Sequence, residues 1–247
     1  MQKKVKKGIV SWFKYLFIYL PLFLFVSSVV TVLAFKWIPV FSTPLMIYRS
    51  IQYAGDENFR TQKRWRSLEK ISPHMQMAVM ASEDTRFLDH KGFDWIEIDK
   101  ALDAGKRGRR LRGASTISQQ TAKNLFLLPA RSWVRKGLEA YFTICIELIW
   151  GKERILEVYL NIAEMGKGIY GAEAAAAVFF GKTAQNLTSR ESALIAATLP
   201  NPLKRRADKP SAYLSSRASD IQRLMGMVEV PEWLSSSKTD KKKTKTR

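Results

Sequence analysis

Two polar segments hold most of the information in this chain: EDTRFLDHKG at residues 83–92 and GASTISQQTAKN at residues 113–124. In the second segment Ser115, Gln119 and Lys123 recur at steps of four, a spacing that stacks side chains on one face of a helix. A glycine followed by hydroxyl residues also marks a helix start, where free N–H groups attract phosphate. The pattern predicts a polar helix face for an anionic ligand, although an ordinary capped and solvated helix has the same spacing.

An uncharged apolar run precedes these segments, from Tyr15 to Phe35. As a helix it spans about 31 Å, close to the hydrocarbon thickness of a bilayer, so it is predicted to cross a membrane. Five lysines lie before the run and only Lys36 follows closely, which places the N-terminus in the cytoplasm. The alternative is a cleaved signal peptide, whose apolar region of about 7–15 residues would be shorter.

Length and composition allow one sizeable globular domain, since the chain has 247 residues and is 46% hydrophobic. The net charge of +19 favours anionic partners, namely phospholipid headgroups, a phosphorylated substrate or nucleic acid. Cys145 is the one cysteine, so it cannot form an internal disulfide and is expected in the core. We divide the chain into a basic cytoplasmic N-terminus, a transmembrane helix, a membrane-proximal linker, a globular domain and a basic disordered tail, at residues 1–14, 15–35, 36–69, 70–230 and 231–247.

The globular domain is predicted to be mainly helical. Ser72 is a candidate N-cap with Pro73 at the first helical position, and Glu83 lies on the apolar face of the helix that follows. Since an unpaired buried carboxylate is costly, Glu83 is expected in a cleft or beside a partner. A capping box at Thr188 and Glu191 predicts another helix.

The segment from Arg131 to Trp150 is predicted to be a core helix with Arg131, Arg135 and Glu139 on one face. A simple ion pair with Arg135 is the alternative interpretation of Glu139. Residues 93–112 end in GKRGRRLR and predict a mobile basic loop, either solvated or placed as a flap over an anionic ligand. GKGIYG at 166–171 matches a dinucleotide-binding pattern, but no strand is expected before it.

The two glutamates Glu83 and Glu139 are accompanied by a set of basic residues: Arg86, Lys123, Arg131, Arg135 and Lys136. Paired carboxylates in a cleft are suited to chemistry at a sugar anomeric carbon. A basic cluster beside them suits a pyrophosphate leaving group, which plain glycoside hydrolysis does not require. The set therefore favours glycosyl transfer from a lipid diphosphate.

Five segments resemble, in order, the signature motifs of the family 51 peptidoglycan glycosyltransferases: EDTRFLDHKG (83–92), GASTISQQTAKN (113–124), RKGLE (135–139), KERILEVYLNIAEMGKGIYG (152–171) and ESALIAATLPNP (191–202). The resemblance covers about residues 70–210. With no transpeptidase domain after it, the chain resembles the monofunctional, membrane-anchored members.

The resemblance implies an all-α, lysozyme-like domain of two lobes behind the transmembrane helix. It implies polymerisation of lipid II into β-1,4-linked glycan strands by inverting transfer, with release of polyprenyl diphosphate. The setting would be the bacterial inner membrane, crossed once, with the catalytic domain in the periplasm. Implied partners are lipid II, the growing polyprenyl-linked glycan, the membrane and proteins of cell-wall synthesis or division, but not nucleic acid.

The resemblance also assigns roles to residues. Glu83 matches the catalytic base, and Glu139 the second glutamate, which assists pyrophosphate departure, orients cations or binds a divalent ion. Residues matching the substrate site are Arg86, Ser115, Thr116, Gln119, Gln120, Lys123, Arg131, Arg135 and Lys136. Residues matching its structural support are Asp84, Phe87, His90, Tyr159 and Asn161. No cofactor is implied as a requirement and no metal ligand is assigned, while Mg²⁺ or Mn²⁺ could assist the diphosphate.

Two other functions are open on the sequence. A lysozyme-like hydrolase or lytic transglycosylase would use similar cleft chemistry, but the basic cluster argues against it. A noncatalytic, membrane-tethered binder of anionic lipid or nucleic acid would explain the charge alone, and it leaves both glutamates without a role.

Overall fold

The structure is a computed structural model that describes residues 15–107, 115–130 and 132–235. The chain forms two compact units, the first ending at Ile38 and the second beginning at Pro39.

The first unit is helical from Tyr15 to Phe35, as a π-helical turn η1 (Tyr15–Tyr19) followed by α2 (Leu20–Phe35). These 21 residues, with a hydropathy of 2.4, are long and apolar enough to cross a membrane. The hydroxyls of Ser27, Ser28 and Thr31 donate hydrogen bonds of 2.7–3.0 Å to backbone carbonyls of the preceding turn. These polar groups therefore need no water, as a hydrocarbon environment requires.

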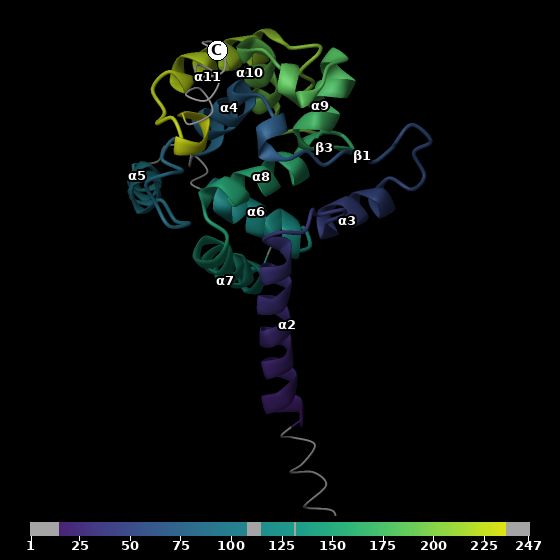
Figure 1. Cartoon of the computed structure of the whole chain (residues 1–247), viewed down its shortest axis with the longest axis vertical. Coiled ribbons are helices and arrows are strands. Elements are labelled where there is room, and N and C mark those ends of the chain that lie inside the picture. Colours follow the sequence, from purple (N-terminus) through teal and green to yellow (C-terminus); the bar gives the residue numbers. More distant parts are fainter. Residues whose placement is uncertain (1–14, 108–114, 131, 236–247) are drawn as a thin grey trace, which may run out of the picture. The chain divides into compact units, whose positions relative to one another are not determined.

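The second unit is mainly helical, which confirms the predicted fold class (Figure 1). Its elements in chain order are α3 (Pro44–Gln52), β1 (Gln62–Lys63), η2 (Leu68–Lys70), α4 (Pro73–Glu83), α5 (Trp95–Lys106), α6 (Ile117–Phe126), α7 (Trp133–Ile149), α8 (Lys152–Ile162), β2 (Glu164–Gly166), β3 (Ile169–Tyr170), α9 (Gly171–Phe180), η3 (Ala184–Asn186), α10 (Ser189–Thr198) and α11 (Ala212–Met225).

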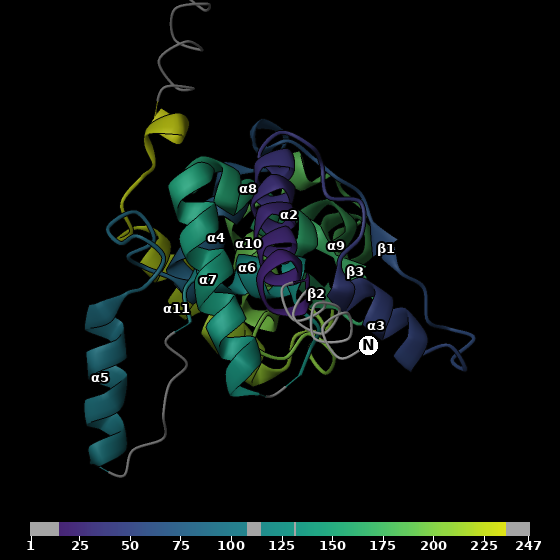
Figure 2. The same ribbon diagram turned by 90° about the horizontal axis from the view of Figure 1, so that it is seen from below.

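The helices of this unit pack in two groups (Figure 1, Figure 2). In one group α4, α10 and α11 pack on one another; in the other, α6 packs on α7 and α8. Helix α9 contacts α8 and the small sheet. The site described below involves the end of α4 and one face of α6, and thus both groups.

Local capping signals set where several helices begin, as predicted. The Ser72 hydroxyl accepts a hydrogen bond from the His74 N–H, with Pro73 in the first turn of α4. Thr188 and Glu191 form the predicted capping box of α10. Each cap satisfies N–H groups that have no partner inside the helix.

A small three-stranded sheet, in the order β1-β3-β2, was not expected from the sequence. Its strands have two or three residues, too few to show an alternating pattern. The expectation that no strand precedes the GKGIYG turn was wrong, because β2 does. However, β2 and β3 pair antiparallel, unlike the parallel strands of a dinucleotide-binding unit. Gly171 has a φ of +79°, and a Cβ there would lie 2.8 Å from the Asn161 carbonyl oxygen, so this glycine serves packing.

The prediction of a loop at 93–112 was wrong for most of the segment, because Trp95–Lys106 form helix α5 (Figure 2). Asp94 caps this helix by accepting from the Glu97 N–H at 3.1 Å. Glu97 in the first turn and Lys106 in the last also match the helix dipole. The basic residues Arg109 and Arg110 of this segment lie outside the described residues.

The prediction that α7 is a core helix was also wrong. Trp133, Val134 and Leu148 are 92%, 75% and 80% exposed. Cys145, expected in the core, is only partly buried. The periodicity identified an apolar face correctly, but it could not reveal that no described element covers this part of it.

The segment predicted as a membrane-proximal linker contains α3, β1 and η2. From Pro39 onward it belongs to the same compact unit as the later helices, and α3 packs on α6. Thr43 caps α3, and β1 pairs in parallel with β3. This segment therefore contributes side chains to the site below.

Candidate active site

A cavity of about 370 Å³ lies between α3, α6, α7, α8 and β2. Its polar lining comprises Arg49, Gln120, Lys123, Asn124, Arg135, Tyr159 and Glu164. The apolar lining includes Leu45, Leu127, Leu199 and Pro202. Cationic and hydrogen-bonding groups thus face one open cleft.

Glu83 ends α4 beside this cavity and is half-buried. Its Oε2 accepts a 2.9 Å hydrogen bond from Nε2 of Gln120, a cavity residue. The Tyr159 hydroxyl donates to Oε1 of the same amide at 3.2 Å. Burial raises the pKa of Tyr159 well above its ordinary value, so this group stays a hydroxyl donor. The chain of donors from Tyr159 through Gln120 fixes the orientation of the Glu83 carboxylate.

Glu139 is 3% exposed and accepts from two cations on its own helix. Arg135 Nη1 lies 2.7 Å from its Oε2, and Lys136 bonds to its other oxygen. The predicted alternative, a simple pair with Arg135, describes only part of this arrangement. Both carboxylate oxygens are occupied, so Glu139 holds Arg135 at the cavity wall.

Lys123 couples the two glutamates electrostatically. Burial lowers its pKa; Glu139 and, more weakly, Glu83 raise it, whereas Arg135 and Lys136 lower it further. Among the described residues no ion pair is formed by Lys123. A lysine so placed on the cavity wall can bind an anion.

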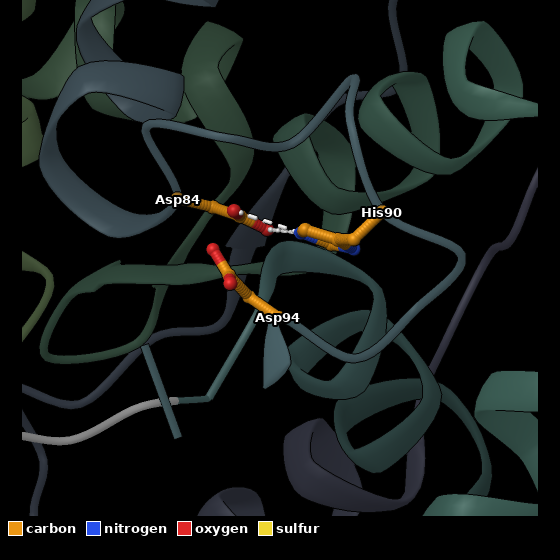
Figure 3. Close-up of side chains that lie close together, drawn as sticks. All are labelled: Asp84, His90 and Asp94. Carbon is orange, nitrogen blue, oxygen red and sulfur yellow. Dashed lines mark hydrogen bonds and ion pairs between the residues drawn. The ribbon is translucent and has the colours of Figure 1, made fainter. Parts of the chain in front are cut away.

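Asp84 and His90 join the end of α4 to the start of α6 (Figure 3). The Asp84 carboxylate lies 3.0 and 3.1 Å from His90 Nε2 and accepts from the Ile117 N–H at 3.0 Å. Because the Gly92 N–H donates to His90 Nδ1, the proton of a neutral ring is on Nε2, facing Asp84. This is a structural role for both residues.

Thr116 and Gln119 are buried in the same junction. Thr116 caps α6, donates to the Gly92 carbonyl at 2.7 Å, and forms a capping box with Gln119. The Gln119 amide oxygen accepts from the Thr116 N–H at 3.0 Å. Neither residue lines the cavity, and Ser115 before them is exposed.

Arg86 is not brought together with Lys123 and Arg135. Its guanidinium lies 3.2 Å from Asp89 and 3.5 Å from Asp94, and it lines a separate cavity of about 340 Å³. Arg131, also predicted in the substrate site, lies outside the described residues.

Asp84, His90 and Asp94 have ligand atoms within 4.8 Å of one another, a separation compatible with a metal ion (Figure 3). Each is nevertheless satisfied by the chain itself, since Asp94 accepts from the Glu97 N–H and pairs with Arg86. We assign no metal here.

The predicted support residues Phe87 and Asn161 lie in the interior. Phe87 is 1% exposed, with the Lys152 ammonium 4.7 Å from its ring centroid. The Asn161 amide bonds to both the N–H and the carbonyl of Arg66, at 2.7 and 2.8 Å. Asn161 thereby fastens the segment before α4 to α8.

Sequence reasoning missed three polar residues near the site. Arg49 lay in the supposed linker, and Glu164 lay in the motif at 152–171 without a role assigned to it. Glu147 accepts from Ser118 and from Lys152, joining α6 to α7 and α8. Its spacing of eight residues from Glu139, two helical turns, was a usable signal.

Most of the chain is similar in sequence to known proteins. The family model described as Transglycosylase matches residues 51–226. A biosynthetic peptidoglycan transglycosylase of Bacteroides thetaiotaomicron is 54% identical over 92% of this chain and 92% of its own. Proteins of the same name from Pseudomonas putida strain GB-1 and Bdellovibrio bacteriovorus are 50% and 53% identical, over 87% and 81% of this chain and 92% and 80% of theirs.

Proposed function

Because this chain belongs to the transglycosylase family and is a peptidoglycan glycosyltransferase, we propose that it polymerises lipid II into β-1,4-linked glycan with release of polyprenyl diphosphate. One observation carries the proposal: Glu83 is held by Gln120 at a cavity that Lys123 and Arg135 also line. The Gln120 side chain therefore contacts the proposed base, Glu83, and lines the cavity in which Lys123 and Arg135 would bind the diphosphate.

In the proposed reaction Glu83 accepts the proton of the acceptor sugar's 4-hydroxyl. The hydroxyl oxygen then attacks C1 of the donor sugar as the bond from C1 to the diphosphate oxygen breaks. The electron pair leaves with the diphosphate, so an α-linked donor gives a β-linked product. Positioned general bases contribute about 10²- to 10⁴-fold to rates.

Lys123 and Arg135 stabilise the charge that develops on the leaving diphosphate, and Arg131 remains a predicted contributor. Glu139 orients Arg135 and Lys136, since both its oxygens accept from these cations. Assistance by Mg²⁺ or Mn²⁺ at the diphosphate stays a prediction.

The helix from Tyr15 to Phe35 is the proposed membrane anchor, crossing the inner membrane once with the N-terminus in the cytoplasm. Lipid II and the growing strand are both held by polyprenyl chains. Tethering the enzyme to the same membrane raises its effective concentration toward both substrates.

The test is incubation of the full-length protein in detergent with labelled lipid II, followed by separation of polymer from substrate. We expect polymer that lysozyme degrades. A parallel incubation with purified sacculi addresses the lytic alternative, for which we expect no soluble glycan fragments. Fragments from sacculi without polymer from lipid II would contradict the proposal.

A further inference from the structure

Ser82 precedes the proposed base in the last turn of α4 and is buried, with 9% of its surface exposed. Its hydroxyl donates to Glu83 Oε1 at 3.2 Å. The same Oγ lies 3.5 Å from the carbonyl oxygen of Ala196 in α10, a helix packed on α4. One buried hydroxyl therefore has two acceptors within reach, and the carboxylate is the nearer of the two.

The two oxygens of the Glu83 carboxylate are held by different kinds of donor. Oε2 accepts from Gln120 Nε2 at 2.9 Å, and an amide nitrogen can only donate. This amide is fixed in turn, because the Tyr159 hydroxyl donates to its oxygen at 3.2 Å. The Ser82 hydroxyl, by contrast, rotates and can direct its proton to either acceptor. The donor at Oε1 can therefore turn away, whereas the donor at Oε2 cannot.

This difference matters when the carboxylate takes up a proton. An ionised carboxylate only accepts hydrogen bonds, and a donor at Oε1 stabilises that charged form. Once Oε1 carries a proton it becomes a donor itself, and the Ser82 hydroxyl needs another acceptor. The Ala196 carbonyl provides one, so the buried hydroxyl avoids the cost of an unpaired polar group.

We propose that Ser82 is a positioning residue for the base and that Oε1 of Glu83 is the atom that accepts the proton. The inference rests on the proposed function. The proton leaves the 4-hydroxyl of the acceptor sugar and forms an O–H bond at Oε1, while the Ser82 hydroxyl turns from Oε1 to the Ala196 carbonyl. Loss of that proton to water restores the carboxylate and reverses the turn.

Other charged and titratable groups surround Glu83 on the neighbouring elements. Lys123 of α6 and Tyr159 of α8 interact electrostatically with its carboxylate. Asp84 follows it in sequence, and Arg217 of α11 donates to the Ser82 carbonyl at 3.5 Å. The Ser82→Ala substitution removes none of these groups, so a changed pH dependence in that variant reports the hydroxyl.

The experiment measures kcat/KM for lipid II against pH, with thermal unfolding, for full-length wild type, Ser82→Ala, Ser82→Thr and Ser192→Ala. Removing a donor from a carboxylate lets it take up a proton at higher pH. We expect the acidic limb of Ser82→Ala to lie about one pH unit higher, with activity about tenfold lower on that side. Ser82→Thr keeps the hydroxyl and should restore the limb. Ser192, a buried serine of α10, is the matched control and should leave the limb in place.

A structural role alone would lower the unfolding midpoint and leave the limb unmoved. An acidic limb at the wild-type pH in Ser82→Ala would therefore overturn the inference. The same displacement in Ser192→Ala would also overturn it, as would a Ser82→Thr variant that unfolds at the wild-type temperature but keeps the limb of Ser82→Ala. Absence of polymer from wild type at every pH would instead contradict the proposed function.

Discussion

Two sets of residues from the same two motifs have different environments. The cavity set, Glu83, Gln120 and Lys123, is at or beside the 370 Å³ cavity. The junction set, Asp84, Thr116, Gln119 and His90, bonds internally and joins α4 to α6. Glu83 and Asp84 are neighbours in sequence, as are Gln119 and Gln120. Similar adjacent side chains can therefore serve catalysis and stability separately, and mutations should separate the two effects.

The largest difference is expected from the cavity set. Lys123→Met removes a cation of the cavity wall that we propose stabilises the leaving diphosphate. It should lower kcat about 10²- to 10³-fold, as loss of one charge-stabilising donor does. Lys100→Met on exposed α5 is the matched control and should leave the rate near wild type. The measurement is the polymerisation rate of both variants under saturating lipid II. Equal rates for the two variants would contradict a special role of Lys123 at the cavity.

The junction set should instead show a stability effect. Asp84→Asn weakens charged hydrogen bonds from His90 and the Ile117 N–H, at a cost of about 1–3 kcal/mol in the free energy of unfolding. Denaturant unfolding of full-length protein measures it. If Asp84→Asn unfolds at the wild-type denaturant midpoint but has lost polymerising activity, the prediction is wrong. Asp84 would then belong to the cavity set.

The paired glutamines provide a smaller and sharper contrast. Gln119→Ala removes half of the α6 capping box and should destabilise by about 1 kcal/mol. Gln120→Ala leaves the Ser82 hydroxyl as the remaining donor to the Glu83 carboxylate and should lower kcat with little change in stability. The free energy of unfolding and kcat are measured for each variant. A stability loss in Gln120→Ala and a kcat loss in Gln119→Ala would show that the capping assignment is wrong.

The smallest effect expected is a shift in pH dependence. Burial lowers the pKa of Lys123, so its cationic form is lost at a lower pH than the ordinary lysine value of about 10.4. The alkaline limb of kcat/KM, which reports the free enzyme, should reflect that loss. Lys123→Arg keeps its charge and should move the limb to higher pH; an unmoved limb would assign the titration to another group.

Sequence patterns were sufficient where a signal is local. Ser72 and Thr188 marked helix starts because a cap bonds to N–H groups two or three residues away. The motifs also supplied Glu83, Gln120 and Lys123, which the structure gathers at the cavity.

Patterns failed where the environment comes from distant segments. Nothing local distinguishes Gln119 from Gln120, because only the tertiary position of Glu83 gives Gln120 its partner. Arg49 meets Glu164 across 115 positions of sequence. Trp133 is exposed because no described element covers it, which periodicity along its own helix cannot reveal.

The most direct test of the account is a time course of polymer formation from labelled lipid II by wild type and Glu83→Gln, with thermal unfolding of both. We predict lysozyme-sensitive polymer from wild type and a rate about 10²- to 10⁴-fold lower for a variant that unfolds at the wild-type temperature. Polymer at the wild-type rate from Glu83→Gln would contradict the assignment of Glu83 as the base.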